Sequence, residues 1–284
     1  CFNGKIGGPA VYHRALSPAE ITALYESRSI DCAGLAARWD LAAHPFGTSI
    51  PDRSRNGLDA RAVNTPMRAV TGARWDGSAA HFLMNPAHYD AIYLHEDDLE
   101  DAGWLVDFTW RLPADIPSGV YAARLRSATA EDYVPFVVRA GSPSEGILLV
   151  LPTFTYQAYA NERYHKAVDW TQTSDQALRL SPQDRFSAET PGLGCSIYDA
   201  HTDGSFNCYS SQLRPVVNFR PKSTSYWNGA GRHFGADMYL VDWLDRYGFA
   251  HDVAIDHDLH ADGLGLLSPY QVVILGSHPE YFSW

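Results

Sequence analysis

The stretch Tyr270-Gln-Val-Val-Ile-Leu-Gly-Ser-His-Pro-Glu-Tyr-Phe-Ser-Trp284 decides the fold class of this chain. Its unbroken apolar run, Val272 to Leu275, is typical of a buried strand in a parallel sheet, and Gly276 ends that run. Four polar side chains follow within a few positions: Ser277, His278, Glu280 and Tyr281. Because ligands of open parallel sheets bind beyond the carboxyl ends of the strands, the stretch predicts a functional site.

Residues 141–284 alternate apolar strands with a helix. Residues 146–151 form a continuous apolar run, residues 236–247 have the period of a helix, and residues 249–255 and 271–275 read as further strands. This pattern predicts the N-terminal part of a Rossmann-like parallel α/β catalytic domain, similar to that of glutamine amidotransferases. Polar groups also follow the first two strands, so we expect three strand ends to meet at one place.

Upstream of that region the chain is rich in short strands and turns. Residues 31–140 predict a β-sandwich region, in which residues 120–125 and 133–139 pair as antiparallel strands and Pro135 marks an edge or a bulge. Residues 1–30 contain "FNGKI…YHRALSPAEI", which resembles the last strand of laminin-G or concanavalin-like lectin modules. Ser17 is expected to cap a helix there. The expected fold is therefore α+β and multidomain, with a lectin-like or Ig-like β-sandwich region followed by the α/β region.

Composition excludes several classes of partner. The formal net charge is −11 and the pI is about 5.5, so a nucleic-acid partner is not expected. No apolar run is long enough to span a bilayer, and we expect a cytoplasmic protein. Cys195 and Cys208 flank a Gly- and Ser-rich loop and could be bridged, although we expect free thiols. The chain begins with Cys1, and we expect it to be a piece of a longer protein that lacks both ends.

Several residues are candidates for chemistry. His278 could act as a general base or a metal ligand, or could fix the turn by a backbone hydrogen bond. Glu280 and Tyr281 are adjacent in an extended segment and should face opposite ways, so we expect only one of them to contact the ligand directly and the other to be a supporting residue. Tyr239 shares a helix face with Trp243 and Tyr247, and a place in the core is the alternative for such a face.

Two other groups of acidic and histidine residues invite a metal interpretation. Residues 256–262 lack the glycine and final glutamate of a calcium loop, and a solvated loop is the preferred interpretation. The second group also reads as a polar loop and comprises His81, His88, His95 and residues 96–101. The sequence contains no Gly-x-Ser-x-Gly elbow and no phosphate-binding loop, so serine hydrolase chemistry is not supported.

Four stretches together resemble the large (beta) subunit of N,N-dimethylformamidase: "SGVYAARL…EDYVPFVVR", "GILLVLPTFTYQAYAN", "HFGADMYLVDWL" and "GLGLLSPYQVVILGSHPEYFSW". The resemblance implies a mononuclear non-haem iron amidohydrolase that cleaves N,N-dimethylformamide or a related small amide to formate and an amine. It also implies iron held by two tyrosines and one glutamate, and a small partner subunit in a hetero-oligomer.

Carried over to this chain, the resemblance makes Tyr239 and Tyr281 the tyrosine ligands of ferric iron. Phenolate and carboxylate oxygens are hard, anionic donors that suit this ion. His278 and Glu280 are then supporting candidates, and the glutamate ligand is expected beyond residue 284. The chain alone is accordingly expected to bind iron weakly or not at all and to be inactive. The alternative is a non-catalytic carbohydrate- or surface-binding β-sandwich protein with an amidotransferase-like α/β domain.

Overall fold

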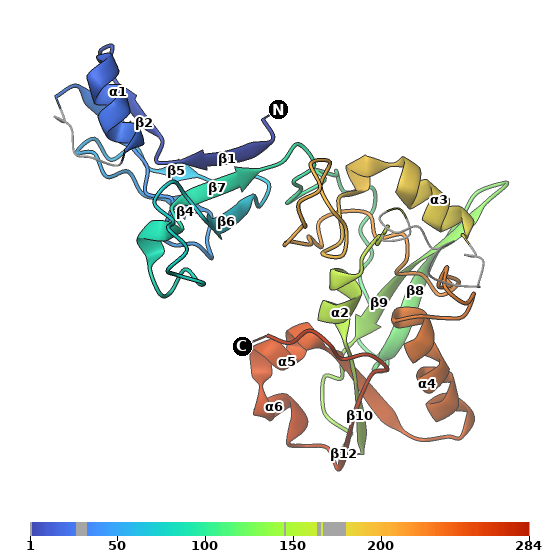
Figure 1. Ribbon diagram of the computed structural model, residues 1–284. Coiled ribbons are helices and arrows are strands. Elements are labelled where there is room, and N and C mark those ends of the chain that lie inside the picture. The colour runs from blue at the N-terminus through green and yellow to red at the C-terminus, as the bar shows by residue number, and fades with distance from the viewer. Residues whose placement is uncertain (1, 27–32, 145, 164–165, 167–179, 284) are drawn as a thin grey trace. The chain divides into compact units, whose positions relative to one another are not determined.

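A computed structural model describes residues 2–26, 33–144, 146–163, 166 and 180–283 of the chain (Figure 1). Its contacts divide the chain into two compact units. Unit 1 comprises residues 1–100 together with residues 201–209, and unit 2 comprises residues 101–200 and 210–284. A short segment from the second half of the chain therefore belongs to the first unit.

Most elements of unit 1 are short strands. They are β1 (Gly4–Gly7), β2 (Ala10–Tyr12), α1 (Pro18–Tyr25), β3 (Leu35–Arg38), β4 (Ser49–Ile50), β5 (Ala60–Arg61), β6 (Met67–Val70), the 3-10 helix η1 (Pro86–His88) and β7 (Ala91–Leu94). Unit 2 contains β8 (Gly119–Arg126), β9 (Glu131–Val138), β10 (Ile147–Leu151), α2 (Thr153–Ala158), α3 (Pro182–Glu189), η3 (Pro191–Leu193), α4 (Phe234–Arg246), β11 (His251–Ile255), α5 (Asp256–Asp262), α6 (Leu264–Leu267) and β12 (Val272–Leu275).

Unit 1 is built on small antiparallel sheets. Strand β7 lies between β1 and β6, and two further pairs form from β2 with β3 and from β4 with β5. The core between them is small and includes Leu41, Ile50 and Ile92. The buried side chain of Arg68 donates to the backbone carbonyls of Leu41, Ala43 and Gly47, and so ties three points of one loop together.

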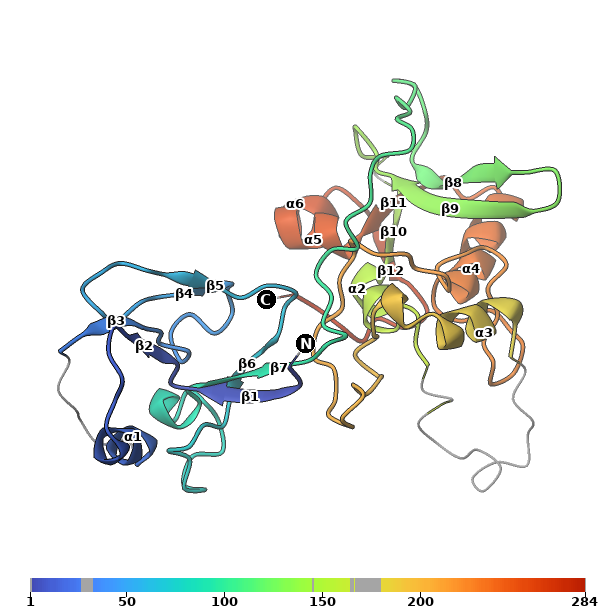
Figure 2. The same ribbon diagram turned by 90° about the horizontal axis from the view of Figure 1, so that it is seen from above.

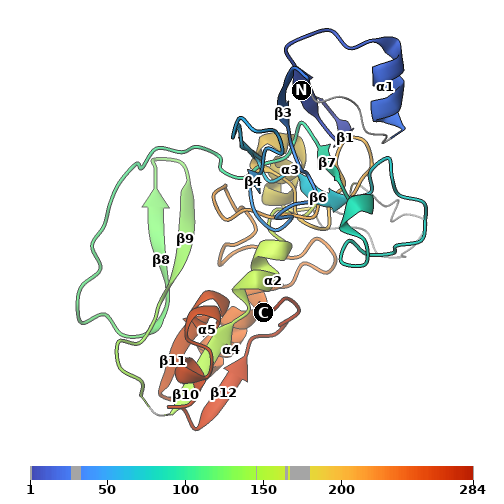
Figure 3. The same ribbon diagram turned by 90° about the vertical axis from the view of Figure 1, so that its left-hand side faces the viewer.

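Unit 2 is organised around a parallel sheet with the strand order β11, β10, β12 (Figure 3). Side chains alternate along β10, so Leu149 and Leu151 face one side while Leu148 and Val150 face the other. Helix α4 covers the first side, and α5 and α6 cover the second (Figure 2). The long β8–β9 hairpin adds Val120 and Val137 to the α4 side.

Most predicted elements are confirmed. Helix α1 has Ser17 as its N-cap and a capping box with Glu20, and β8 pairs with β9 in antiparallel register through Pro135. Strands β10, β11 and β12 and helix α4 lie where the apolar pattern places them, within two residues. The molecule is thus mixed α/β with several small sheets, whereas the lectin-like sandwich and the Rossmann-like topology stay predictions.

Two features differ from the expectation. Strand β12 is not buried, because it pairs with β10 on one side only among the described strands, and Val272 and Leu275 are 48% and 46% exposed. The boundary between the two units also falls between residues 100 and 101, whereas the sequence places a boundary near residue 140. The reason is that β8 and β9 pack against the parallel sheet of unit 2. The predicted sandwich of residues 31–140 is therefore shared between the units.

Candidate functional site

The segment after β12 is anchored by side chains of two helices. The Ser277 N–H donates to Oδ1 of Asp237 in α4 at 2.5 Å. The N–H groups of Glu280 and Tyr281 both donate to Oγ1 of Thr155 in α2, at 3.0 and 3.2 Å. Asp237 and Thr155 are completely buried. The backbone beneath Glu280 and Tyr281 is therefore held at buried hydrogen bonds, which favours a fixed site.

Two phenol groups converge on the carboxylate of Glu280. Tyr159, at the end of α2, donates from Oη to Oε2 at 2.8 Å, and Tyr198 donates from Oη to Oε1 at 3.2 Å. The two phenol rings stack, with centroids 4.1 Å apart and planes 15° from parallel. Tyr281 joins through its Oη, 2.6 Å from the Oη of Tyr198. We call these four residues the phenol–carboxylate cluster.

The phenols of this cluster hold their protons strongly. Burial raises the pKa of Tyr159 to about 12, and the hydrogen bond to Glu280 acts in the same direction. Burial also raises the pKa of Tyr198 and of Tyr281 above the ordinary tyrosine value, and the hydrogen bond between the two phenols raises the pKa of Tyr281 further while it opposes the rise at Tyr198. Without a cation, the neutral phenols therefore act as hydrogen-bond donors to Glu280 and to one another.

Two histidines border the cluster. Nε2 of His278 lies 3.2 Å from Oε2 of Glu280. The ring of His233 contacts the ring of Tyr159 edge-on at a centroid distance of 4.2 Å and lies 5.3 Å from the His278 ring. Both ring nitrogens of His233 are buried, and neither makes a hydrogen bond with the described residues. Buried polar atoms without a partner are rare in proteins, so these two mark a place where a ligand could bind.

His233 is unusual in charge and in backbone as well. Burial lowers its pKa to about 3, and the positive charge of Arg232 contributes, so the imidazole is neutral near pH 7. Its φ of 51° lies in the left-handed region, although it is not a glycine. Non-glycine residues in such conformations cluster at functional sites, where the surrounding structure maintains the strain.

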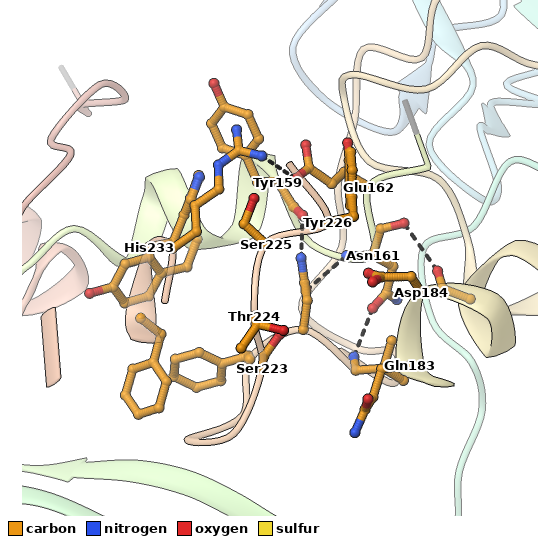
Figure 4. A pocket seen from close by; sticks show the side chains of 17 residues that line it. Tyr159, Asn161, Glu162, Gln183, Asp184, Ser223, Thr224, Ser225, Tyr226 and His233 are labelled. Atoms are coloured by element: carbon orange, nitrogen blue, oxygen red, sulfur yellow. Dashed lines mark hydrogen bonds and ion pairs between the residues drawn. The ribbon is translucent and has the colours of Figure 1, made fainter. Parts of the chain in front are cut away.

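A small cavity lies beside Tyr159 and His233 (Figure 4). Its volume of about 40 Å³ suits a ligand of a few heavy atoms. Arg232 lines it and pairs with Glu162 at 2.5 Å, while its guanidinium lies 4.8 Å above the ring of Tyr159. Burial raises the pKa of Glu162 to about 7. The cavity wall thus combines a neutral imidazole with an ion pair.

The structure brings together only some of the residues predicted as site residues. Tyr281, His278 and Glu280 all lie in or beside the cluster, whereas Tyr239 lies on α4 with 66% of its surface exposed. Among the described residues, no hydrogen bond, ion pair or ring contact joins Tyr239 to the cluster. Its role as an iron ligand stays a prediction. The core alternative is wrong for this helix face, since Trp243 is 45% and Tyr247 is 71% exposed.

The three predicted strand ends do meet. The Phe154 N–H, just after β10, donates to Oδ2 of Asp256, just after β11, at 2.8 Å. Thr155 in turn accepts the two backbone bonds from the segment after β12. The acidic stretch of residues 256–262 was expected to be a solvated loop, but it forms helix α5. The carboxylate of Asp258 accepts from the Ile255 N–H at 3.0 Å and so stabilises the first turn of that helix.

Tyr159 and Tyr198 are the two site residues that the sequence reasoning missed. Tyr159 follows the first strand of the sheet by only eight positions, so the strand-end rule could have found it. Tyr198 lies in the aperiodic stretch of residues 155–235, and no local pattern marks it. Its place beside Glu280 depends on a contact between residues 82 positions apart.

Two compositional predictions can be compared with the structure. Cys195 is buried and Cys208 exposed, and both are thiols, which confirms the expectation that they are not bridged. Within the described residues, no helix combines the length and the apolar character needed to cross a bilayer.

Comparison with known proteins gives one consistent result. The family described as "N,N-dimethylformamidase beta subunit-like, C-terminal" matches residues 67–284. The chain is 40% identical, over 292 aligned residues, to the N,N-dimethylformamidase beta subunit of Paracoccus aminophilus, and 37% identical to that of an Alcaligenes species. Both alignments cover 100% of this chain and 38% of the relative. The chain therefore spans less than half the length of these relatives.

Proposed function

The chain belongs to the N,N-dimethylformamidase beta subunit-like family, and from this premise we propose that it forms part of an iron-dependent amidohydrolase. Its substrate would be N,N-dimethylformamide or a related small amide, hydrolysed to formate and an amine. The observation that supports this best is the convergence of two phenols, the buried Tyr159 and the partly buried Tyr198, on one carboxylate, which is the donor set that the family resemblance implies.

The donor atoms of the cluster fit a small, highly charged cation. Oxygen ligands of such ions lie about 2 Å from the ion and hence roughly 3 Å from one another. The Oη atoms of Tyr159 and Tyr198 lie 2.8 and 3.2 Å from the two carboxylate oxygens of Glu280. Two phenolates and one carboxylate would balance the charge of Fe³⁺. We therefore assign the iron ligands to Tyr159, Tyr198 and Glu280.

This assignment changes the roles expected from the sequence. Glu280 becomes the carboxylate ligand that we expected beyond residue 284, and Tyr281 supports Tyr198 through the 2.6 Å contact between their hydroxyl oxygens. Tyr239 has no part in it. With all three donors in the chain, we propose that the chain binds iron by itself, contrary to the expectation from the sequence.

The bound ion would polarise the amide carbonyl and lower the pKa of water. His278 is placed to move protons, because its Nε2 lies beside Oε2 of Glu280 and its side chain is half exposed. In hydrolysis, water forms the new C–O bond and the C–N bond breaks. We propose that His278 takes the proton from the water and returns it to the nitrogen of the departing amine, so that the proton count balances.

His233 and the cavity would orient the substrate. A neutral imidazole can donate one hydrogen bond and accept another, and both nitrogens of His233 are available for this. The cavity that it lines with Tyr159 is small, which favours amides of a few heavy atoms over peptides. Arg232 and Glu162 would keep the far wall polar and fixed through their 2.5 Å ion pair. The relatives' name further suggests that a partner subunit accompanies the chain.

A ferric titration tests the proposal. Adding Fe³⁺ to the chain should produce a visible phenolate-to-iron absorption band with a one-to-one end point. Tyr159→Phe and Tyr198→Phe should each weaken iron binding at least tenfold and shift or abolish the band. Tyr239→Phe is the matched control, because the same oxygen is removed from an exposed residue.

The substitutions also separate our assignment from the ligand pair expected from the sequence. Tyr281→Phe should shift the band modestly, because it removes only a hydrogen bond to Tyr198. A band that survives Tyr159→Phe but disappears with Tyr239→Phe would restore the pair Tyr239 and Tyr281. A chain that binds no iron at any pH between 6 and 9 would refute the metal proposal altogether.

A further inference from the structure

A second group of ligating side chains lies in unit 1, around His95. His95 directly follows β7, and its side chain is 1% exposed, while that of His201 is 2% exposed. The two imidazole rings stack with centroids 3.7 Å apart and planes 2° from parallel. Two carboxylates of the loop after β7 contact these rings: those of Asp97 and Asp98. What sequence reasoning describes as a polar loop is thus buried at His95.

Hydrogen bonds hold one nitrogen of each ring and leave the other for a ligand. Nε2 of His95 lies 2.9 Å from Oγ of Ser205, and Nδ1 of His201 lies 2.6 Å from Oδ1 of Asp97. Nδ1 of His95 is buried and makes no hydrogen bond with the described residues, although Oδ1 of Asp98 is 3.5 Å away. Metal-binding histidines are oriented in this way, by a hydroxyl or carboxylate on the nitrogen opposite the metal.

The charge of the group also favours a cation. Three carboxylates surround the two rings, because Asp203 accepts from Oη of Tyr93 at 2.7 Å and lies 3.5 Å from Nε2 of His95. The Asp98 side chain is only 8% exposed. Buried carboxylates are retained where they are paired or coordinate a metal.

We propose that His95, Asp98 and His201 form a binding site for a divalent transition-metal ion, with zinc as the ion that fits best. One ligand atom from each of the three lies within 4.8 Å of the others. Two imidazoles and one carboxylate are a donor set that zinc accepts, with water in the fourth position. The site is separate from the phenol–carboxylate cluster in sequence and in chemistry.

Binding requires a local adjustment that can be measured. Ligand atoms about 2.1 Å from a tetrahedral ion lie about 3.4 Å apart, so the three groups must move closer by roughly 1 Å. One ion cannot lie in two parallel ring planes, so one imidazole has to tilt out of the stack. Because His201 belongs to the segment of residues 201–209, the ion would clamp that segment to the end of β7.

Zinc titration against a competing chelating dye tests the proposal. The titration is made with the Tyr198→Phe variant, so that zinc bound at the phenol–carboxylate cluster is not counted. The result then tests the site around His95 independently of the proposed iron site. One zinc ion should bind per chain. His95→Ala, His201→Ala and Asp98→Asn should each weaken binding at least tenfold, whereas His260→Ala, on the exposed surface of α5, should not.

Two further measurements protect the test from misfolded variants. Co²⁺ bound to the same Tyr198→Phe chain should give the visible absorption of a four-coordinate nitrogen and oxygen site, a measurement that needs no substitution of His95, Asp98 or His201. Zinc in excess should raise the unfolding temperature by about 5 °C or more, with Asp98→Asn removing the rise. No zinc bound at micromolar concentration, or binding equal in all variants, would overturn the proposal.

Discussion

Glu280 is the residue whose surroundings define the candidate site. Its two carboxylate oxygens accept from Tyr159 and Tyr198, and its backbone N–H is fixed by Thr155. Glu280 and Tyr281 were expected to face opposite ways, yet both reach Tyr198, at 3.2 and 2.6 Å. Alternation applies to regular strands, and the segment after β12 is not a strand. The expectation that adjacent side chains point in opposite directions is therefore wrong for Glu280 and Tyr281.

His233 gives a prediction that depends on pH. Its folded-state pKa of about 3 is below the unfolded value near 6.5, so the unfolded chain binds a proton that the folded chain does not. The stability due to the neutral ring is present above pH 6.5 and is lost as the pH falls toward 3. His233→Asn should remove this loss, of about 1.4 kcal/mol per pH unit between pH 6 and 4.

Urea unfolding at several pH values measures this slope. His260→Asn is the control, because His260 is exposed on α5 and should leave the slope unchanged. Asparagine is chosen at position 233 because it tolerates a positive φ better than most residues. Equal slopes for His233→Asn and the unsubstituted chain would show that the buried ring does not titrate as described.

Among the elements, the end of β12 and helix α4 approach each other closely at Gly276. A Cβ atom built on Gly276 would lie 2.8 and 2.9 Å from the two carboxylate oxygens of Asp237 and would collide with the ring of Pro152. Asp237 cannot withdraw, because it is buried and accepts from Oη of Tyr156 and from the Ser277 N–H. The glycine is needed for close approach, not for its φ.

Gly276→Ala should therefore lower the free energy of unfolding by about 1–3 kcal/mol, the usual cost of overpacking. It should also weaken iron binding, because the segment that carries Glu280 starts at this residue. Gly265→Ala in α6 is the matched control, since a Cβ there meets nothing within 4 Å and should stabilise the helix by roughly 0.5–1 kcal/mol. Chemical denaturation measures the free energy of unfolding of both variants. Equal destabilisation by the two substitutions would contradict the role given to Gly276.

The elements also show why the sequence predicts the fold better than the site. Strands β10 and β11 and helix α4 follow from apolar runs and a helical period that each lie within a few residues. The exposure of β12 and the place of Tyr198 depend on partners distant in the sequence, and no local pattern records them. The family resemblance implies two tyrosines and one glutamate as donors but does not show which tyrosines lie near a glutamate. The contacts of Tyr159 and Tyr198 with Glu280 are found only in the structure.

At the scale of the whole molecule, the chain runs from unit 1 into unit 2, returns to unit 1 for residues 201–209, and goes back to unit 2. The returning segment makes several side-chain contacts inside unit 1, among them the hydrogen bonds of Asp203 with Tyr93, Ser205 with His95, and His201 with Asp97. Each of these hydrogen bonds involves β7 or the loop after it. Unit 1 is therefore not a fold of its first hundred residues alone, and its stability depends on a segment encoded far downstream.

Replacing residues 201–209 by a Gly and Ser sequence of equal length should loosen unit 1 without loosening the parallel sheet of unit 2. Each lost hydrogen bond is worth about 1 kcal/mol, so the amides of β7 should exchange with deuterium at least tenfold faster, while those of β10 keep their protection. Replacing the exposed turn of residues 127–130 by Gly and Ser is the control and should leave the amide exchange rates of β7 and β10 unchanged. Equal acceleration in β7 and β10 would mean that the two units unfold together, and the returning segment would then stabilise the whole chain as one cooperative body.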